Sequence, residues 1–295
     1  IINSENATSG FAFDSDPGGD PGTFTHNNGT IFFKDTNLSS HSLMRPVGTT
    51  FYDFKIHYDN YNLTSWAGIT VANDTTLYEP TGAGGTLSEG CNGYNGTGQT
   101  MIQNGAKLDV GGCSAGAVAN LGSLVCSGTI ELSEGTTNIN GINGDSYKFR
   151  IENNGTVIHN DGTLVLDAST DGGMYKNTGS NGKYLYNLIV KNDTTSARAV
   201  QNVGQVTVVN DLIVSGAGSD AASWDVAFYN AGAGGFTVSG NATVINGAKL
   251  SREVDSGYIF NTFGSLTIGS KGWYDATSGT TKLYGKTGVT YTQTG

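Results

Sequence analysis

The sequence predicts an all-β chain that folds as a parallel β-helix, a β-solenoid of stacked coils. First, an asparagine that follows an apolar or aromatic residue and precedes a glycine recurs along the chain, and its copies from Asn153 onward are 24, 25, 28 and 31 residues apart. That spacing is typical of one coil of short strands and turns. Second, 45 glycines stand against only four prolines and 14% charged residues, a composition rich in turn formers but unlike that of a disordered chain. Third, no segment has a sustained helical period.

In a stack of coils, each recurrent asparagine is expected at an equivalent turn. There its amide would bond to the asparagine of the next coil, and the following glycine would supply a positive φ at the corner. The asparagines of this pattern are Asn104, Asn120, Asn153, Asn177, Asn202, Asn230 and Asn261.

Short runs rich in β-branched and aromatic residues separate these turns and are predicted to be strands. About three such runs per period favour a parallel β-helix over an antiparallel sandwich, whose turns would not keep the same Asn-Gly order. Residues 1–47 are predicted to be an irregular N-terminal segment, with a possible role as an interface arm, and residues 48–295 to be the solenoid body. The clearest runs are 50–57, 129–132, 147–151, 156–158, 163–166, 206–208 and 212–214.

Charge and hydropathy exclude several function classes. The net charge is −10 and the 15 Lys and Arg residues are scattered, so nucleic-acid binding and attraction to an anionic membrane surface are not expected. The apolar stretches are far shorter than the roughly 20 residues that cross a bilayer, so no membrane insertion is predicted. Because the chain begins at Ile1 without Met, we expect a processed or partial product of an extracellular protein.

Nine N-x-[ST] sequons would be glycan acceptors outside the cell. They occur at Asn6, Asn28, Asn37, Asn62, Asn73, Asn95, Asn154, Asn192 and Asn241.

The chain has three cysteines, an odd number for a secreted protein. Cys91 and Cys113 are 22 residues apart, about one coil, so they could pair as a disulfide between adjacent coils, which leaves the third thiol free or available for an intermolecular bond. The alternative is that the cysteines are unpaired and buried as small hydrophobic residues.

The sequence offers one weak metal site and no other cofactor. Asp14, Asp16 and Asp20 could share a calcium ion, because Ca²⁺ takes clusters of oxygen ligands on turns. The stretch lacks the twelve-residue loop with a closing glutamate, so an ordinary solvated turn is the competing interpretation. The four histidines are far apart and no C-x-x-C occurs, so no zinc site is predicted.

The runs LYNLIVKND (185–193), NDLIVSG (210–216) and SGNATVINGAKL (239–250) resemble the secreted right-handed parallel β-helix surface proteins of bacteria and archaea. This resemblance covers roughly residues 48–290. It implies a fold and a family of roles: adhesin, surface-layer or sheath component, or subunit of an extracellular filament. Because parallel β-helices also include polysaccharide lyases and glycoside hydrolases, an enzyme is the rival interpretation.

An enzyme of that kind needs carboxylates that face a sugar. The candidates are simpler to explain as solvated turn residues, since their spacing gives no acidic shelf across adjacent coils. No catalytic residue is therefore predicted. The carboxylate pairs considered are Asp167 with Asp171 and Glu131 with Glu134, and the cations are Arg150 and Arg252.

Aromatic residues near loops suggest an adhesin as a second alternative, because exposed rings can stack on sugars or anchor an interface. They could equally cap the interior of the coils. The residues concerned are Trp66, Trp224 and Trp273 with Tyr58, Tyr61, Tyr94, Tyr229, Tyr274 and Tyr284.

The C-terminal stretch is strand-like to its end and has no evident cap, so its edge is open to another copy. We therefore expect a structural protein that self-assembles into an extracellular filament, sheath or surface layer, with glycans as possible further partners. Pairing is expected between Lys282 to Thr292 of one copy and either Ile1 to Phe13 or Thr30 to Phe33 of the next.

Overall fold

A computed structural model provides the fold of this chain. It describes residues 2–3, 11–12, 25–35, 42–45, 50–58, 63–65, 69–80, 86–89, 94–111, 118–178, 184–218, 224–230, 235–252, 260–276, 280–283 and 291–293.

The strands form three sheets, here called A, B and C. Sheet A has 12 strands: β1(Ile2–Asn3), β3(Thr30–Asp35), β6(Asp53–Tyr58), β9(Thr75–Leu77), β12(Gln99–Ile102), β15(Ser123–Cys126), β18(Tyr147–Ile151), β21(Gly173–Asn177), β24(Arg198–Asn202), β27(Val226–Asn230), β29(Ala248–Arg252) and β31(Trp273–Ala276). Sheet B has seven: β2(Phe11–Ala12), β4(Ser42–Arg45), β7(Leu63–Ser65), β10(Thr86–Glu89), β13(Lys107–Asp109), β16(Thr129–Glu131) and β19(Thr156–Ile158). Sheet C has 14: β5(Thr50–Phe51), β8(Ile69–Val71), β11(Tyr94–Gly96), β14(Val118–Leu121), β17(Thr136–Ile139), β20(Thr163–Asp167), β22(Tyr184–Leu185), β23(Asn187–Lys191), β25(Val206–Val208), β26(Leu212–Ser215), β28(Phe236–Ile245), β30(Phe260–Ile268), β32(Thr280–Leu283) and β33(Tyr291–Gln293).

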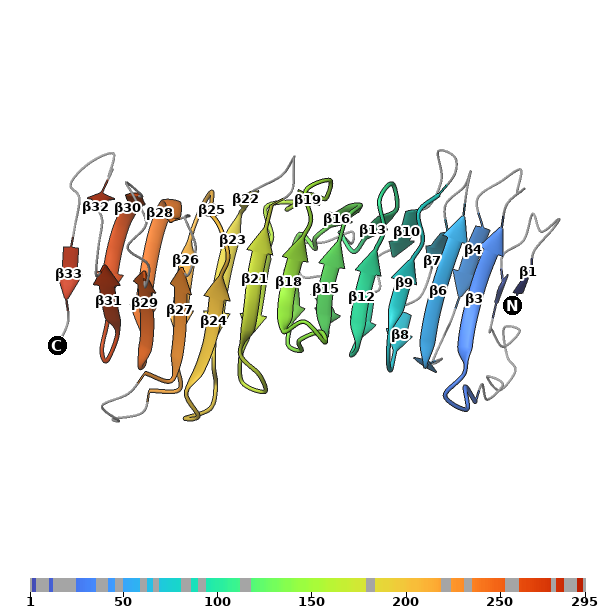
Figure 1. The fold of residues 1–295 in the computed structure, drawn as a ribbon, viewed down its shortest axis with the longest axis horizontal. Coiled ribbons are helices and arrows are strands. Elements are labelled where there is room, and N and C mark those ends of the chain that lie inside the picture. Colours follow the sequence, from blue (N-terminus) through green and yellow to red (C-terminus); the bar gives the residue numbers. More distant parts are fainter. Residues whose placement is uncertain are drawn as a thin grey trace.

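From β3 to β20 the chain visits sheets A, B and C in the same order in each coil, as β18, β19 and β20 show before β21 begins the next coil. Every strand pairs in parallel with the equivalent strand of the neighbouring coil, for example β18 with β21 and β20 with β23. Figure 1 shows the strands of sheet A side by side along the long axis, with β1 and β33 at opposite ends. The predicted all-β parallel solenoid is confirmed.

Alternation along the strands places one set of apolar residues inside. On sheet C, Leu121, Ile139, Leu166, Val190 and Val214 lie in register in successive coils, and all are fully buried. A side chain of this kind contributes roughly 1.5–3 kcal/mol when it leaves water. The core is therefore a thin column that runs the length of the stack, as expected for coils that contact only their neighbours.

Glycines at two different corners, Gly122 between sheets C and A and Gly162 between sheets B and C, allow successive coils to approach closely. A Cβ atom on Gly122 would lie 2.0 Å from the carbonyl oxygen of Thr97, and one on Gly162 would lie 1.9 Å from that of Ser133. No side chain fits at these distances, so both positions require glycine.

The described strands of the N-terminal segment belong to the same sheets, since β1 pairs with β3 and β2 with β4. The boundary between residues 47 and 48 stays a prediction. In the described part of the chain, no helix has the length and apolarity to cross a membrane.

The recurrent asparagines do not share one position, which corrects the expectation of a single asparagine corner. Their spacing reports the coil length but does not distinguish the corners of a coil. Asn104 and Asn153 lie in exposed turns, Asn120 lies within β14, Asn177, Asn202 and Asn230 are buried at the ends of β21, β24 and β27, and Asn261 lies within β30.

Side-chain hydrogen bonds between asparagines of neighbouring coils do occur, but most of the asparagines in them do not belong to the recurrent set. Asn138 donates to the side-chain oxygen of Asn120, and Asn210 donates to that of Asn187, each over 2.9 Å. Asn230 instead donates to the carbonyl of Gly204, as does Asn202 in the preceding coil.

Candidate functional site

Among the described residues, sheet B ends at β19, and this end is here called the interruption of sheet B. The next short strand, β22, pairs with β25 and belongs to sheet C. On the other two sides the same two coils remain paired, β18 with β21 and β20 with β23. The break is therefore confined to one side of the stack.

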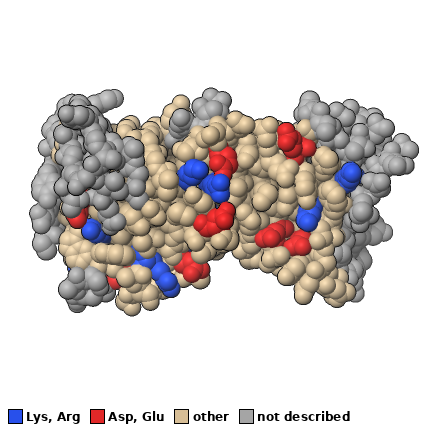
Figure 2. All heavy atoms as spheres, in the orientation of Figure 1, with Lys and Arg blue, Asp and Glu red and all other residues tan. Residues whose placement is uncertain are grey.

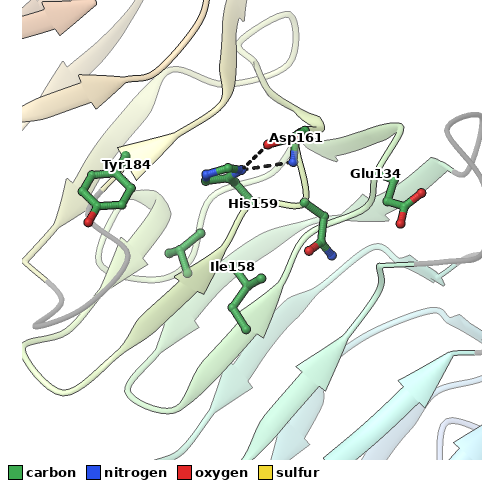
Figure 3. A pocket seen from close by; sticks show the side chains of 7 residues that line it. Glu134, Ile158, His159, Asp161 and Tyr184 are labelled. Atoms are coloured by element: carbon green, nitrogen blue, oxygen red, sulfur yellow. Dashed lines mark hydrogen bonds and ion pairs between the residues drawn. The ribbon is translucent and has the colours of Figure 1, made fainter.

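A depression of about 530 Å³ lies at this interruption (Figure 3). Its lining side chains come from three successive coils, since Glu134 precedes β17, residues 157–161 precede β20, and Tyr184 lies in β22. Its lining residues are Glu134, Val157, Ile158, His159, Asn160, Asp161 and Tyr184.

A tight turn positions His159 in the depression. Asn160 and Asp161 both have positive φ, at 47° and 55°, which these residue types tolerate better than most. The backbone N–H of Asp161 donates to Nδ1 of His159 over 3.0 Å, and the N–H of Gly162 donates to the His159 carbonyl over 2.9 Å. Because Nδ1 accepts a bond, Nε2 is the ring nitrogen that remains to donate to a ligand.

The next coil supports the imidazole from behind. The ring of His159 stacks on Tyr186, with centroids 5.7 Å apart and planes inclined by 25°. The carbonyl of Tyr186 accepts a bond from the N–H of Asn210 in the following coil. The histidine is thus held by its own turn and by two neighbouring coils.

The same turn occurs earlier in the chain, which sequence reasoning missed. His26 accepts a 3.0 Å bond from the N–H of Asn28 and stacks on Tyr52 at 5.6 Å. The signal was available as the repeated letters HNNGT (26–30) and HNDGT (159–163). Since both copies stack on a tyrosine, the turn itself is a structural device, and its position at the interruption distinguishes the copy at His159.

The exposed groups of the depression are chemically mixed. Tyr184 is 50% exposed and Ile158 is 37% exposed, which provides ring and aliphatic surface. The side chains of Glu134 and Asp161 are also exposed, and neither lysine nor arginine is among the lining residues. The depression can therefore contact an apolar face, accept hydrogen bonds and donate one, and it offers no lysine or arginine to an acidic ligand.

The structure does not bring Glu131 and Glu134, a carboxylate pair considered from the sequence, into one site. Glu131 forms an ion pair with Lys107 and accepts a 3.0 Å bond from Asn160. Burial opposes ionisation, yet these two partners lower the pKa of Glu131 below its ordinary value. Only Glu134 reaches the depression.

Of the other enzyme candidates, Asp167 and Arg150 are held in ion pairs, and Asp171 is half-buried and attracts the buried amine of Lys148. Asp167 pairs with Lys191 at 3.1 Å, and Arg150 pairs with Glu152 and Asp145. The side chain of Arg252 is not described. Among the described residues, no three His, Cys, Asp or Glu side chains come together to hold a metal ion.

Oppositely charged side chains lie beside one another on the face in Figure 2. Two ion pairs on sheet A join neighbouring coils, Lys176 to Glu152 at 3.8 Å and Lys249 to Asp275 at 3.2 Å. Each surface pair of this kind contributes little stability, roughly 0–1 kcal/mol. Their arrangement still limits any patch of one sign on this face.

Lys148 is a second group that the sequence did not reveal. The register between β18 and β21 shifts between Tyr147 and Phe149, and Lys148 at that irregularity is fully buried. Its Nζ donates to the carbonyls of Asn140 over 3.0 Å and Gly141 over 3.2 Å. Burial lowers the pKa of this amine to about 8, against the opposing attraction of two nearby aspartates.

The loop aromatics do not form one surface. Tyr94 is buried, and its hydroxyl lies 3.3 Å from that of Thr100, so it is an interior residue. Trp273 is 38% exposed on β31, while Trp224 is half-buried. Tyr229 and Tyr274 are also half-buried, and Trp66, Tyr61, Tyr284 and the side chain of Tyr58 lie outside the description.

Some sequons are accessible and others are not. Asn192 is fully buried and its amide donates to the carbonyls of Ser196 and Asp225, which leaves no room for a glycan in the folded protein. The Asn73 amide donates to Asp53 over 2.8 Å. Asn28, Asn95, Asn154 and Asn241 are exposed, whereas Asn6, Asn37 and Asn62 lie outside the described residues.

The cysteine and calcium predictions fall largely outside the described ranges, which contain neither Cys91 nor Cys113, and none of Asp14, Asp16 and Asp20. Cys126 is buried and has no disulfide partner. Burial raises the pKa of its thiol to about 12.

Comparisons with protein families, with curated proteins and with solved structures find no match to this chain. Of what the resemblance to secreted surface β-helices implies, the structure supports the solenoid fold. No family is assigned to the chain.

Proposed function

We propose that this chain is a structural rod that assembles end to end into an extracellular filament, sheath or surface layer. The observation that carries the proposal is the state of the two ends. Among the described residues, β31, β32 and β33 each pair with a strand on one side only, and β1 does the same at the other end.

The geometry of the edges suits head-to-tail addition. All strands run parallel, so a second copy in the same orientation would continue the sheets rather than reverse them. Heterologous contacts of this kind produce filaments when they do not close into a ring. On the N-terminal side, β1 pairs only with Phe33 and Lys34 of β3, so the Thr30 to Phe32 part of that edge has one neighbour strand, β6.

A proline test can separate assembly from folding. Along a parallel strand, successive residues direct their N–H groups to opposite sides. Of Thr281→Pro and Lys282→Pro in β32, one therefore removes an N–H directed at β30 and the other removes one directed outward. The outward variant should keep the thermal unfolding of the wild-type monomer but lose assembly, and the inward variant should lower the unfolding temperature.

Negative-stain electron microscopy with sedimentation velocity on the same sample would measure the outcome. We expect rods that lengthen with protein concentration for the wild type. A protein that stays monomeric at every concentration, or that polymerises equally well with both prolines, would contradict the proposal. The location outside the cell has its own test, which is glycan occupancy at an exposed sequon such as Asn154 in native material.

A further inference from the structure

We propose that the depression at the interruption of sheet B binds a neutral pyranose unit of a glycan. Tyr184 and Ile158 would contact a face of the sugar, and Glu134 and His159 would bond to its hydroxyl groups. This inference does not depend on end-to-end assembly, because β19 and β22, the strands beside the depression, lie near the middle of the rod (Figure 1).

The apolar part of the depression matches the carbon-bound face of a sugar ring. Tyr184 is half-exposed and Ile158 is more than a third exposed, although most large hydrophobic side chains of this solenoid are inside. Figure 3 shows Tyr184 on one side of the depression and Glu134 on the other, with His159 and Ile158 between them. A ring surface opposite polar groups is the usual composition of a small-molecule site, and about 530 Å³ is within the usual size.

The polar part supplies acceptors and one oriented donor. The carboxylates of Glu134 and Asp161 accept hydrogen bonds, which suits hydroxyl groups that donate them. Nδ1 of His159 is occupied by the N–H of Asp161, so Nε2 is available to a hydroxyl oxygen. Hydroxyls both donate and accept, and a vicinal pair on one ring could use a carboxylate and the imidazole together.

The charge of the lining decides between classes of sugar. Two carboxylates without a lysine or arginine repel uronate and sulfated glycans. A simple amine would satisfy the carboxylates but would leave the surfaces of Tyr184 and Ile158 without a partner. A neutral pyranose uses both halves of the depression.

The site is also preorganised, which reduces what binding must order. His159 is stacked on Tyr186, and Leu185 next to Tyr184 is fully buried. The backbone of Leu185 is held by the next coil, where the N–H of Val209 donates to its carbonyl over 2.8 Å. Tyr184 therefore projects from a fixed strand rather than from a mobile loop.

The test is saturation-transfer NMR of the purified chain with methyl glycosides of glucose, galactose and mannose at millimolar concentration. Glucuronate and glucosamine serve as the charged probes. We expect transfer to at least one neutral glycoside, with its ring protons closest to the protein, and none to glucuronate. No transfer to any neutral glycoside, or transfer to glucosamine alone, would overturn the proposal.

Three variants locate the binding. Tyr184→Ala should weaken it by about tenfold, the loss expected when one aromatic contact is removed. Glu134→Gln should weaken it while leaving the exposed ring in place. Trp273→Ala is the matched control, because it removes an aromatic side chain of similar exposure elsewhere and should change nothing. Equal binding by Tyr184→Ala and wild type, with unchanged circular dichroism, would exclude this depression as the site.

Discussion

Replacing Lys148 with Met should change how the stability of this protein responds to alkaline pH. The amine is fully buried and donates to two backbone carbonyls, so it is held inside the solenoid in a place where a charge is costly. Burial lowers its pKa from the ordinary 10.5 to about 8. Met has a similar length and no charge, which makes it the suitable replacement.

The direction of the effect follows from proton binding. Because the folded pKa is lower than the unfolded one, the unfolded chain binds more protons between about pH 8 and pH 10.5. The free energy of unfolding contributed by Lys148 therefore rises with pH across this window and is constant below it. The difference between the two pKa values corresponds to about 3 kcal/mol.

Urea unfolding of wild type and Lys148→Met, followed by circular dichroism from neutral pH to pH 11, measures this directly. Other titrating groups occur in both proteins and cancel in the difference of their unfolding free energies. That difference should be flat up to about pH 8 and should then shift in favour of the wild type by about 3 kcal/mol, relative to its value at neutral pH, by pH 10.5. Lys34→Met is the control, since Lys34 is exposed on β3 and its loss should leave the alkaline response unchanged.

A difference that stays flat to pH 11 would refute the reasoning. It would mean that Lys148 reaches water in the folded protein, or that its attraction to Asp167 and Asp171 outweighs burial. Nitrogen-15 NMR of the lysine side chain would distinguish these two cases, because a water-exposed amine exchanges its protons rapidly and an ion-paired one does not.

Two further predictions concern the interior. Gly162→Ala should lower the free energy of unfolding by more than about 2 kcal/mol, because its Cβ would meet a backbone oxygen. Gly144→Ala is the control: a Cβ there has no atom within 4 Å, so its free energy of unfolding should stay within about 0.5 kcal/mol of wild type. Equal effects of the two substitutions would contradict this prediction. In a Cys91→Ser, Cys113→Ser background, the thiol of Cys126 should not react with Ellman's reagent at pH 8 until urea unfolds the chain, since burial raises its pKa to about 12; rapid labelling of the folded protein would show that the thiol is accessible.

Strand positions could be predicted closely from the sequence because β-rich runs and glycine turns are local signals. The predicted runs 147–151, 156–158 and 206–208 coincide with β18, β19 and β25. The apolar pattern of the run 50–57 predicts one strand, but the structure divides it into β5 and β6 at Tyr52, where the chain turns from sheet C to sheet A. This corner lies inside an apolar run without a glycine, so no local sequence signal indicates the turn.

The buried lysine could not be predicted, because strict alternation in β18 places Tyr147, Phe149 and Ile151 on one face and Lys148 on the other. The register shift between Tyr147 and Phe149 breaks that alternation and turns the lysine inward. Such an irregularity depends on the register with β21, which is a property of two coils and not of one segment.

The candidate site escaped prediction for a similar reason. Glu134 and Asp161 are 27 residues apart, and Tyr184 lies in the next coil, so no local motif joins them. The sequence analysis names Glu134 only as a partner of Glu131. In the structure, Glu131 forms an ion pair with Lys107 and accepts a hydrogen bond from Asn160.

An interruption on one side is what allows a regular solenoid to present a distinct site. Where neighbouring coils are paired, equivalent residues lie in register. Charged residues there can form ion pairs within a coil or with the next coil, as Lys191 does with Asp167. At the described end of sheet B, next to β19, sheets A and C keep the two coils stacked. The exposed ring, the imidazole and the carboxylates lie together there. Because the open strand edges lie at the ends, binding by this depression and assembly of the rod would use separate surfaces, and a Tyr184→Ala variant should still assemble.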